Sequence, residues 1–432
     1  MIKENFFSLS FEAVIVFLII FSPLFFGSVI PGAESIIQVA ILILAVIFLA
    51  KLIFSDSPKI IFPTYSYLIL AVLAVGLLQI FPLPARLLKV ISPQTFNLYQ
   101  NYLPDFNPAG SLTLGFYVPA VKRELFRAIC FFLLFLITLN LVNEKKQCQR
   151  LILVIIFFGL GLSFYGVVNK FFILNKDIAH TFSTFGNRNN FSGYMIMVVP
   201  LTVGYALSCR QKAKKFLFGF IAALISASVL LSLSRAGSLS LFFSLFLMFI
   251  LAKREKTHFK AYWLFPAVFA MGAIFIFMAG VGPIQERFGL FGSGLSGRIG
   301  LAKDSLGLVK DFPIFGIGWG NFQYLFTFYK QFVSTAHYYY LHNDHLQLVV
   351  EIGLIAASAY FYFLYRLFKD IFGQLEKRHD LFVKNIVIGG VSGTLGVFVH
   401  SFVEFNFHIP AILFLFWFIL GLVYKCVYTH FE

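Results

Sequence analysis

Charge is scarce in this sequence, and acidic charge is the scarcest. Only 12% of the 432 residues are charged, with 19 acidic residues against 34 basic ones. A soluble globular domain carries about 25% charged residues, so this composition excludes an ordinary water-soluble fold. Hydrophobic residues make up 59% of the chain, which is typical of a protein that lies in a lipid bilayer.

Cysteine is rare, and nucleotide-binding motifs are absent. Of the four cysteines, Cys130 lies in a long apolar run, and Cys148, Cys209 and Cys426 lie at the ends of such runs, next to Lys and Arg. None is therefore placed to form an extracytoplasmic disulfide. No Walker-type loop occurs, so any energy for the reaction must come with the substrate or from a gradient.

Long apolar runs are what the sequence has in abundance. About twelve of them reach the length that crosses the hydrocarbon core as a helix, and they are continuous where a β-barrel strand would alternate. The first run is too long for a secretory signal and a second follows at once, so we expect a retained helix. The expected spans are 11–30, 35–54, 63–82, 124–143, 150–172, 190–209, 215–233, 237–252, 261–281, 343–367, 381–402 and 409–428. The sequence thus predicts an all-α integral membrane protein, a single polytopic domain over residues 1–432.

Basic residues cluster on one side of these spans, in short connections such as "CRQKAKK" and "AKREKTHFK". Under the positive-inside rule this side is cytoplasmic, together with both chain termini. Residues 83–122 and 282–342 then become two large extracytoplasmic loops, the second containing short helices. The net charge of +15 is accordingly an effect of the inner leaflet and no sign of nucleic-acid binding.

Three arginines stand at expected helix starts on the opposite, outer side. "FGNRNNFSG" places Arg188 before the sixth span, "SLSRAG" places Arg235 before the eighth, and Arg298 opens an expected short helix at 298–311. A helix N-terminus presents free N–H groups, and a guanidinium matches phosphate oxygens, so these positions favour an anion site. Taken alone, Arg188 is equally well explained as a surface cap with a snorkelling side chain, and a lone arginine such as Arg235 at a membrane boundary is usually an interfacial anchor.

A polar stretch, "YYYLHNDHLQLVVEIGL", leads into the tenth span and places His342 and His345 on either side of Asn343 and Asp344. Two histidines three residues apart supply only two ligands, and nothing nearby repeats the pattern, so we expect no metal and no other cofactor. A structural hydrogen bond is an alternative role for His342. We favour a base or substrate contact, because His342 shares its side of the membrane with the three arginines.

These outer residues form one candidate site for a phosphate-bearing substrate. Cations would hold a diphosphate and stabilise its charge as it leaves, and the histidine would orient or deprotonate an acceptor hydroxyl. The expected catalytic residues are Arg188, Arg298 and His342. The expected substrate-binding residues are Asn187, Arg235, Asn343, Glu404 and His408, the last two from "HSFVEFNFHIP".

The motifs occur in the order seen in the O-antigen ligase and polymerase family, which the chain resembles from about residue 75 to 425. The resemblance rests on "TFGNRNNFSGY", "SRAG", "GRIGLAKDSLGLVKDFPIFGIGWGNF", "HNDHLQLVVEIGL", "HSFVEFNFHIPAILFLFWFILGL" and "LLQIFPLPARLLKVISP". It implies about twelve helices in the bacterial inner membrane and a large periplasmic loop after the ninth. It also implies transfer of a glycan from undecaprenyl diphosphate to an acceptor hydroxyl, without nucleotide or metal.

By motif, Arg188 and Arg298 match family arginines that contact the diphosphate, and His342 matches the ligase histidine that precedes an Asn. Arg235 is a further match. Gly353 fills the glycine position of the ligase pattern, but Ala356 stands where that pattern has Gly, Thr or Tyr. This departure leaves the acceptor open between lipid A-core, a growing glycan and a protein hydroxyl.

A transporter or flippase for an anionic or lipid-linked glycan is the alternative function. The sequence shows no repeat between its halves, and its two large outer segments are unequal in length. Charges are also not placed in mid-span on both halves, as the central site of a carrier requires. These features favour the glycosyltransferase over the carrier.

Overall fold

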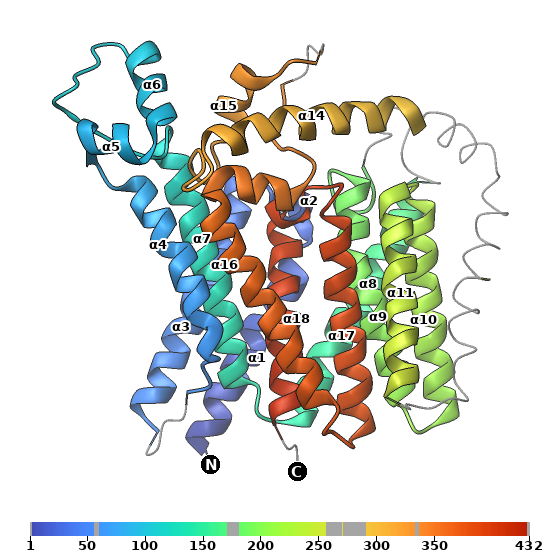
Figure 1. The fold of residues 1–432 in the computed structure, drawn as a ribbon. Coiled ribbons are helices and arrows are strands. Elements are labelled where there is room, and N and C mark those ends of the chain that lie inside the picture. Colours follow the sequence, from blue (N-terminus) through green and yellow to red (C-terminus); the bar gives the residue numbers. More distant parts are fainter. Residues whose placement is uncertain are drawn as a thin grey trace.

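The computed structural model describes residues 2–55, 60–170, 181–255, 270, 291–332 and 337–429, and these residues form a bundle of helices (Figure 1). The N-terminal part contains α1 (Ile2–Phe21), α2 (Leu24–Ser28), α3 (Pro31–Ile53), α4 (Tyr67–Ile80), α5 (Ala85–Ile91), α6 (Pro93–Tyr102), α7 (Val118–Leu141) and α8 (Lys145–Val168). The remainder contains α9 (Arg188–Ser208), α10 (Lys212–Leu231), α11 (Arg235–Arg254), α14 (Phe291–Asp311), α15 (Phe322–Tyr329), α16 (Asp344–Leu375), α17 (Leu381–His400) and α18 (Pro410–Tyr428). Two short strands, β1 (Leu83–Pro84) and β2 (Ser111–Leu112), pair antiparallel with Leu83 opposite Leu112.

The prediction of an all-α integral membrane protein is confirmed. Within the described residues, nine helices are long and apolar enough to cross a membrane, and Phe6–Phe21 and Thr64–Ile80 are shorter apolar helices. Each of these eleven corresponds to an expected span, and the twelfth, 261–281, lies outside the described residues except for residue 270. In the apolar windows of α9 and α18 89% of residues are buried, against 28% in α3. Helices α9 and α18 therefore form the centre of the bundle, and α3 lies at its rim.

The two ends of the bundle differ in construction (Figure 1). Both chain termini lie at one end, here called the terminal face, whereas α5, α6, α14 and α15 lie at the other, here called the loop face. The expected short helix at 298–311 is the second part of α14. The described parts of the two expected large loops thus share the loop face.

Helices α9 and α17 approach closely because glycines of α17 lie against the backbone of α9. A Cβ on Gly393 would lie 2.9 Å from the carbonyl oxygen of Met197, and one on Gly389 would lie 2.5 Å from that of Pro200. In lipid no hydrophobic driving force holds helices together, so they associate through close packing, which small residues at the crossing allow. This contact fixes the start of α9 and the end of α17 relative to each other.

Helix α16 is broken at Gly353, which has φ 77° and ψ 169°. Such a break leaves backbone groups without helical partners, which is costly inside a membrane bundle. The segment 313–321 fills the break: Ile317 N–H donates to Val350 C=O at 3.0 Å, Gly318 N–H to Glu351 C=O at 3.1 Å, and Leu354 N–H to Pro313 C=O at 2.8 Å. The glycine-rich run "FPIFGIGWGNF" therefore completes the backbone hydrogen bonding of α16.

The fully buried side chain of Gln79 connects this segment to α4. Its amide nitrogen donates to the carbonyl oxygens of Phe315 at 2.7 Å and Glu351 at 2.9 Å, and its oxygen accepts from Trp319 N–H at 2.9 Å. Three chain segments, from α4, the 313–321 run and α16, therefore meet at one amide. The first half of α16 takes its position from this junction.

We expect Gly353→Ala to destabilise the protein. A Cβ there would overlap the carbonyl oxygen of Ile314, and the positive φ is strained for any L-residue by about 1–3 kcal/mol. Thermal unfolding in detergent should show a clear drop in melting temperature. Gly373→Ala is the matched control, because it lies in the same helix with no atom within 4 Å of its Cβ position. Equal melting temperatures of the two variants would contradict this account of the break.

Candidate functional site

A buried carboxylate on the loop face collects three partners from distant parts of the chain. Glu404, between α17 and α18, is fully buried. Its Oε1 accepts hydrogen bonds from Arg298 Nη2 and from Asn189 Nδ2, the latter at 2.5 Å, and its Oε2 lies 3.3 Å from His342 Nδ1. We call these four residues the Glu404 cluster. It brings together three of the residues that the sequence singles out, and it adds Asn189.

Helix capping explains how the arginines of α9 and α11 come to this face. The Asn187 side chain accepts from Asn189 N–H at 2.8 Å, so α9 begins at Arg188. In the same way the Ser234 side chain accepts from Gly237 N–H at 3.2 Å, so α11 begins at Arg235. The Ser234 hydroxyl also donates to the Asn189 side-chain oxygen at 2.7 Å. The two helix starts are thereby linked to each other and to Glu404.

The backbone at His342 is held in an unusual conformation, with φ 56°. Left-handed backbone at a non-glycine residue is uncommon and strained, and such residues concentrate at functional sites. The residues on both sides are fixed: Leu341 N–H donates to the Gln347 side chain at 2.9 Å, and Asp344 N–H donates to Ser401 C=O at 2.9 Å. Asn343 caps α16 by accepting from Leu346 N–H at 3.0 Å. These contacts fix the backbone on both sides of His342 and thereby the direction of its side chain.

Burial and charge act in opposite directions on Glu404. Burial disfavours its charged form, but the hydrogen bond from His342 and the positive charge of Arg298 outweigh this and lower the pKa of the carboxyl group. The side chains of His342 and Arg298 are 30% and 35% exposed. Both groups therefore keep a surface for a ligand while they contact the buried carboxylate.

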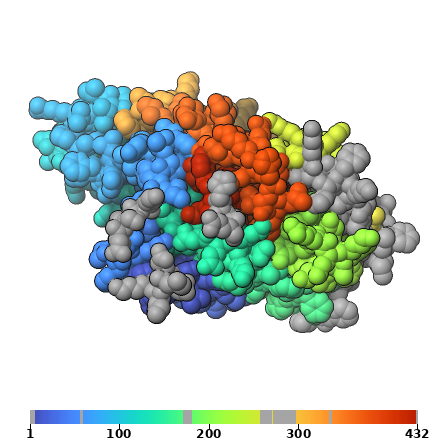
Figure 2. All heavy atoms as spheres, turned by 90° about the horizontal axis from the view of Figure 1, so that it is seen from below, coloured from blue at the N-terminus to red at the C-terminus, as the bar shows by residue number. Residues whose placement is uncertain are grey.

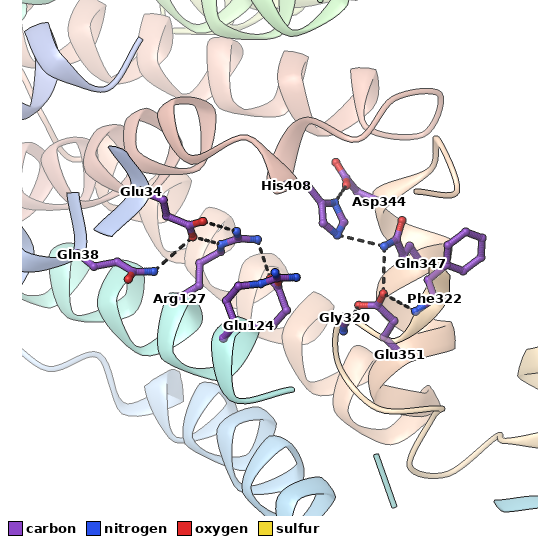
Figure 3. Close-up of polar contacts among 11 residues, drawn as sticks. Glu34, Gln38, Glu124, Arg127, Gly320, Phe322, Asp344, Gln347, Glu351 and His408 are labelled. Carbon is purple, nitrogen blue, oxygen red and sulfur yellow. Dashed lines mark hydrogen bonds and ion pairs between the residues drawn. The ribbon is translucent and has the colours of Figure 1, made fainter. Parts of the chain in front are cut away.

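A second polar system, the His408 network, is drawn in Figure 3. Its members are Asp344, Gln347, Glu351 and His408. His408 Nδ1 lies 2.8 Å from Asp344 Oδ1, and the Gln347 amide nitrogen lies 3.1 Å from His408 Nε2 and 3.0 Å from Glu351 Oε1. Because the Gln347 oxygen already accepts from Leu341 N–H, Nε2 of His408 must accept here, and the neutral tautomer carries its proton on Nδ1.

The His408 network supports the segments around it. The Glu351 carboxylate accepts from Gly320 N–H at 2.9 Å and from Phe322 N–H at 3.4 Å, at the start of α15. From its sequence motif, His408 is expected among the substrate-binding residues. In the structure it contacts Tyr340, whose ring stacks on Phe405 at 4.8 Å, and that ring lies 4.9 Å from His342. An aromatic layer therefore separates the two polar systems.

An ion triad that the sequence analysis missed lies near this network (Figure 3). Arg127 donates to both oxygens of Glu34, at 2.5 and 2.8 Å, and to Glu124 at 2.7 Å. All three residues are buried. Their signal in the sequence is charge at the start of the expected spans 35–54 and 124–143, where an ion is expensive unless it is paired.

A cavity separates the triad from the first half of α16 and extends into the bundle between α4, α7, α16 and α18. Its volume is about 120 Å³. One water molecule requires roughly 10–15 Å³ on the same measure, so the cavity has room for several. Glu124, Arg127 and His408 line its polar end, and Phe131 and Trp417 line its apolar end. In the described part of the chain no three His, Cys, Asp or Glu side chains are placed to hold a metal ion.

Residues 220–361 match the family model described as O-antigen ligase. This segment is similar to the O-antigen ligase family. It contains Arg235, Arg298 and His342, so the resemblance seen in the motifs is confirmed there. Arg188 and Glu404 lie outside the matched residues, and the tertiary structure brings Glu404 to Arg298 and His342 within them. Among curated proteins none matches the chain.

The lowered pKa of Glu404 predicts a pH-dependent contribution to stability. A carboxyl whose folded pKa is depressed stabilises the fold fully above its ordinary value of about 4.5 and loses this contribution as the pH falls through the folded pKa. The difference in melting temperature between wild type and Glu404→Gln should therefore shrink on acidification from pH 6 toward pH 3. Glu376→Gln, at an exposed carboxylate of the terminal face, is the control. A constant difference for Glu404→Gln across this range would count against the charged, paired carboxylate.

Proposed function

We propose that the chain transfers a glycan from an undecaprenyl-diphosphate carrier to an acceptor hydroxyl on the periplasmic face of the bacterial inner membrane. The observation that carries the proposal is the sharing of the buried Glu404 carboxylate by Arg298 and His342. A cation suited to a diphosphate and a base suited to a hydroxyl thus lie next to each other. The O-antigen ligase match over residues 220–361 supports the same chemistry.

His342 takes the role of general base. Its Nδ1 faces Glu404, so Nε2 is the nitrogen that accepts the proton of the acceptor hydroxyl. A carboxylate on the far nitrogen holds the imidazole in the required tautomer and stabilises the imidazolium that forms. The fixed backbone around His342 keeps that nitrogen directed at one position.

In the transfer step, the acceptor oxygen forms a bond to the anomeric carbon of the donor glycan, and the bond from that carbon to the diphosphate oxygen breaks. The electron pair leaves with the diphosphate, and the hydroxyl proton passes to His342. Arg298, with Arg188 and Arg235 at the starts of α9 and α11, stabilises the charge that develops on the leaving group. A single displacement of this kind inverts the anomeric configuration.

The shared carboxylate couples the two halves of the reaction. Arg298 contacts Glu404 in the structure, and a diphosphate would draw the guanidinium toward its own oxygens. The guanidinium of Arg298 then neutralises less of the negative charge of Glu404. The carboxylate therefore stabilises a protonated His342 more strongly. Donor binding would in this way prepare the base for the acceptor.

We expect Arg298→Ala to slow glycan transfer by about 10²–10³, as loss of a charge-stabilising group does in other enzymes. The assay uses purified protein with a synthetic undecaprenyl-diphosphate oligosaccharide and scores released carrier and transferred glycan. Lys303→Ala is the control, because Lys303 is an exposed cation on the same helix. Wild-type transfer by Arg298→Ala would refute this diphosphate site, and solute flux without any transfer would favour a transporter.

His342 and Glu404 should behave as one unit. If the carboxylate acts through the imidazole, His342→Ala reduces transfer strongly but measurably, Glu404→Gln reduces it less, and the double variant is no slower than His342→Ala alone. Rates of all three variants in the same assay provide the test. Multiplicative losses in the double variant would show that the two residues act independently. Comparing lipid A-core, glycan and protein acceptors in wild type then assigns the acceptor class.

A further inference from the structure

The terminal face carries a cavity at the opposite end of the bundle from the Glu404 cluster. This hollow is open to solvent and has a volume of about 890 Å³, where α9 ends and α8, α10 and α17 begin. Figure 2 shows this face, on which the green segments of α8 to α10 adjoin the orange and red segments of α16 and α17. Cavities of about 300–1,000 Å³ are typical of small-molecule sites.

The walls of this cavity are strongly basic. Lys145, Arg210, Lys214, Lys215 and His379 line it, and Asp380 is the one carboxylate among the described lining residues. Asp380 is already engaged, because it pairs with Lys145 at 2.5 Å and accepts from Phe382 N–H at 2.7 Å. These contacts lower the pKa of Asp380 although its partial burial opposes the charged form.

Three cations of the cavity are not matched by a carboxylate of the described residues. Within the described residues neither Arg210, Lys214 nor Lys215 forms an ion pair, and Arg210 and Lys214 are exposed. Bringing three like charges to one hollow costs electrostatic energy unless an anion enters it. The arrangement therefore has the charge of an anion site.

Helix dipoles add to this charge. The first turn of α10 holds Lys212, Lys214 and Lys215, although the positive end of a helix favours acidic residues. The N-caps Gln211 of α10 and Glu144 of α8 make no side-chain capping bond. Helix starts with unused N–H groups and neighbouring cations bind phosphate readily.

The surroundings of the cavity favour a lipid as the source of the phosphate. Tyr205, Leu381 and Phe382 contribute apolar or aromatic wall beside the cations. On α10, directly after the lysines, Phe216 and Leu217 are 60% and 52% exposed, as side chains in contact with acyl chains are. A molecule with a charged head and an apolar tail satisfies both parts.

We propose that this cavity binds the phosphate headgroup of an anionic phospholipid from the adjacent leaflet. Arg210, Lys214 and Lys215 contact the phosphate, the N-terminus of α10 faces it, and the acyl chains follow the exposed apolar side of α10. Basic pockets between membrane helices recognise anionic headgroups in this way. The proposal does not depend on the glycan-transfer function, because the two sites lie at opposite ends of the bundle.

Basic loops also arise simply from the positive-inside rule, which requires charge on one side of the membrane but no particular arrangement. The two explanations differ in what they expect of cations elsewhere on the same face. Lys146, Lys253 and Lys369 are exposed on the terminal face and do not line the cavity. A triple alanine variant at these lysines has the same charge as a triple alanine variant at Arg210, Lys214 and Lys215.

The test is titration of the full-length protein in uncharged detergent with a fluorescent phosphatidylglycerol. We expect the variant with alanine at Arg210, Lys214 and Lys215 to bind about tenfold or more weakly than wild type. The control variant should bind as wild type does, and phosphatidylcholine should bind neither protein measurably. Thermal unfolding checks that each variant folds, and the single change Lys214→Glu replaces the triple variant if it does not fold.

Two results would overturn the proposal. Equal weakening in the cavity variant and the control variant would show that only the overall charge of the face matters. Displacement of the lipid by inorganic pyrophosphate at concentrations comparable to the lipid would show that the cavity takes soluble phosphates. Glycan transfer, measured in parallel, reports separately on the Glu404 cluster.

Discussion

The structure depends on one constraint: backbone N–H and C=O groups inside a membrane bundle must be paired. Helix α16 violates helical pairing at Gly353, and the segment 313–321 restores it with bonds to Val350, Glu351 and Leu354. Since Gln79 ties that segment to α4, the first half of α16 is held from outside its own helix. His342 lies two residues before the start of this half-helix. The hydrogen bonds from the segment 313–321 therefore also position the candidate base.

A similar requirement for pairing applies to buried charge on the loop face. A fully buried carboxylate is expensive unless it is paired, and Glu404 has an arginine, an asparagine and a histidine as partners. The same contacts assemble a guanidinium and an imidazole at one place, where a diphosphate and a hydroxyl could meet. The partners come from α9, α14 and the segment before α16, so the cluster also joins the two halves of the chain.

The sequence predicts the spans well, because an apolar run long enough to cross the membrane has few alternatives. Its prediction for α14 starts at Arg298, seven residues after the helix begins, because nothing in "FGSGLSG" (291–297) favours a helix by composition. Asn187 and Asn343, expected as substrate contacts, act as helix caps in the structure. Capping and ligand binding draw on the same residue types, so local sequence does not separate them.

By itself, the sequence determined the membrane class and most of the helices, and it offered a set of candidate polar residues, because hydropathy and charge placement are local properties. Only the tertiary structure decided which of these residues touch. Arg298 and Glu404 stand 106 positions apart. The pairing of Arg127 with Glu34 follows from the packing of α3 against α7, whereas Glu124 is a neighbour of Arg127 on α7 itself. A buried ion takes whichever partner the packed helices bring within reach, and one chain's sequence does not record that choice.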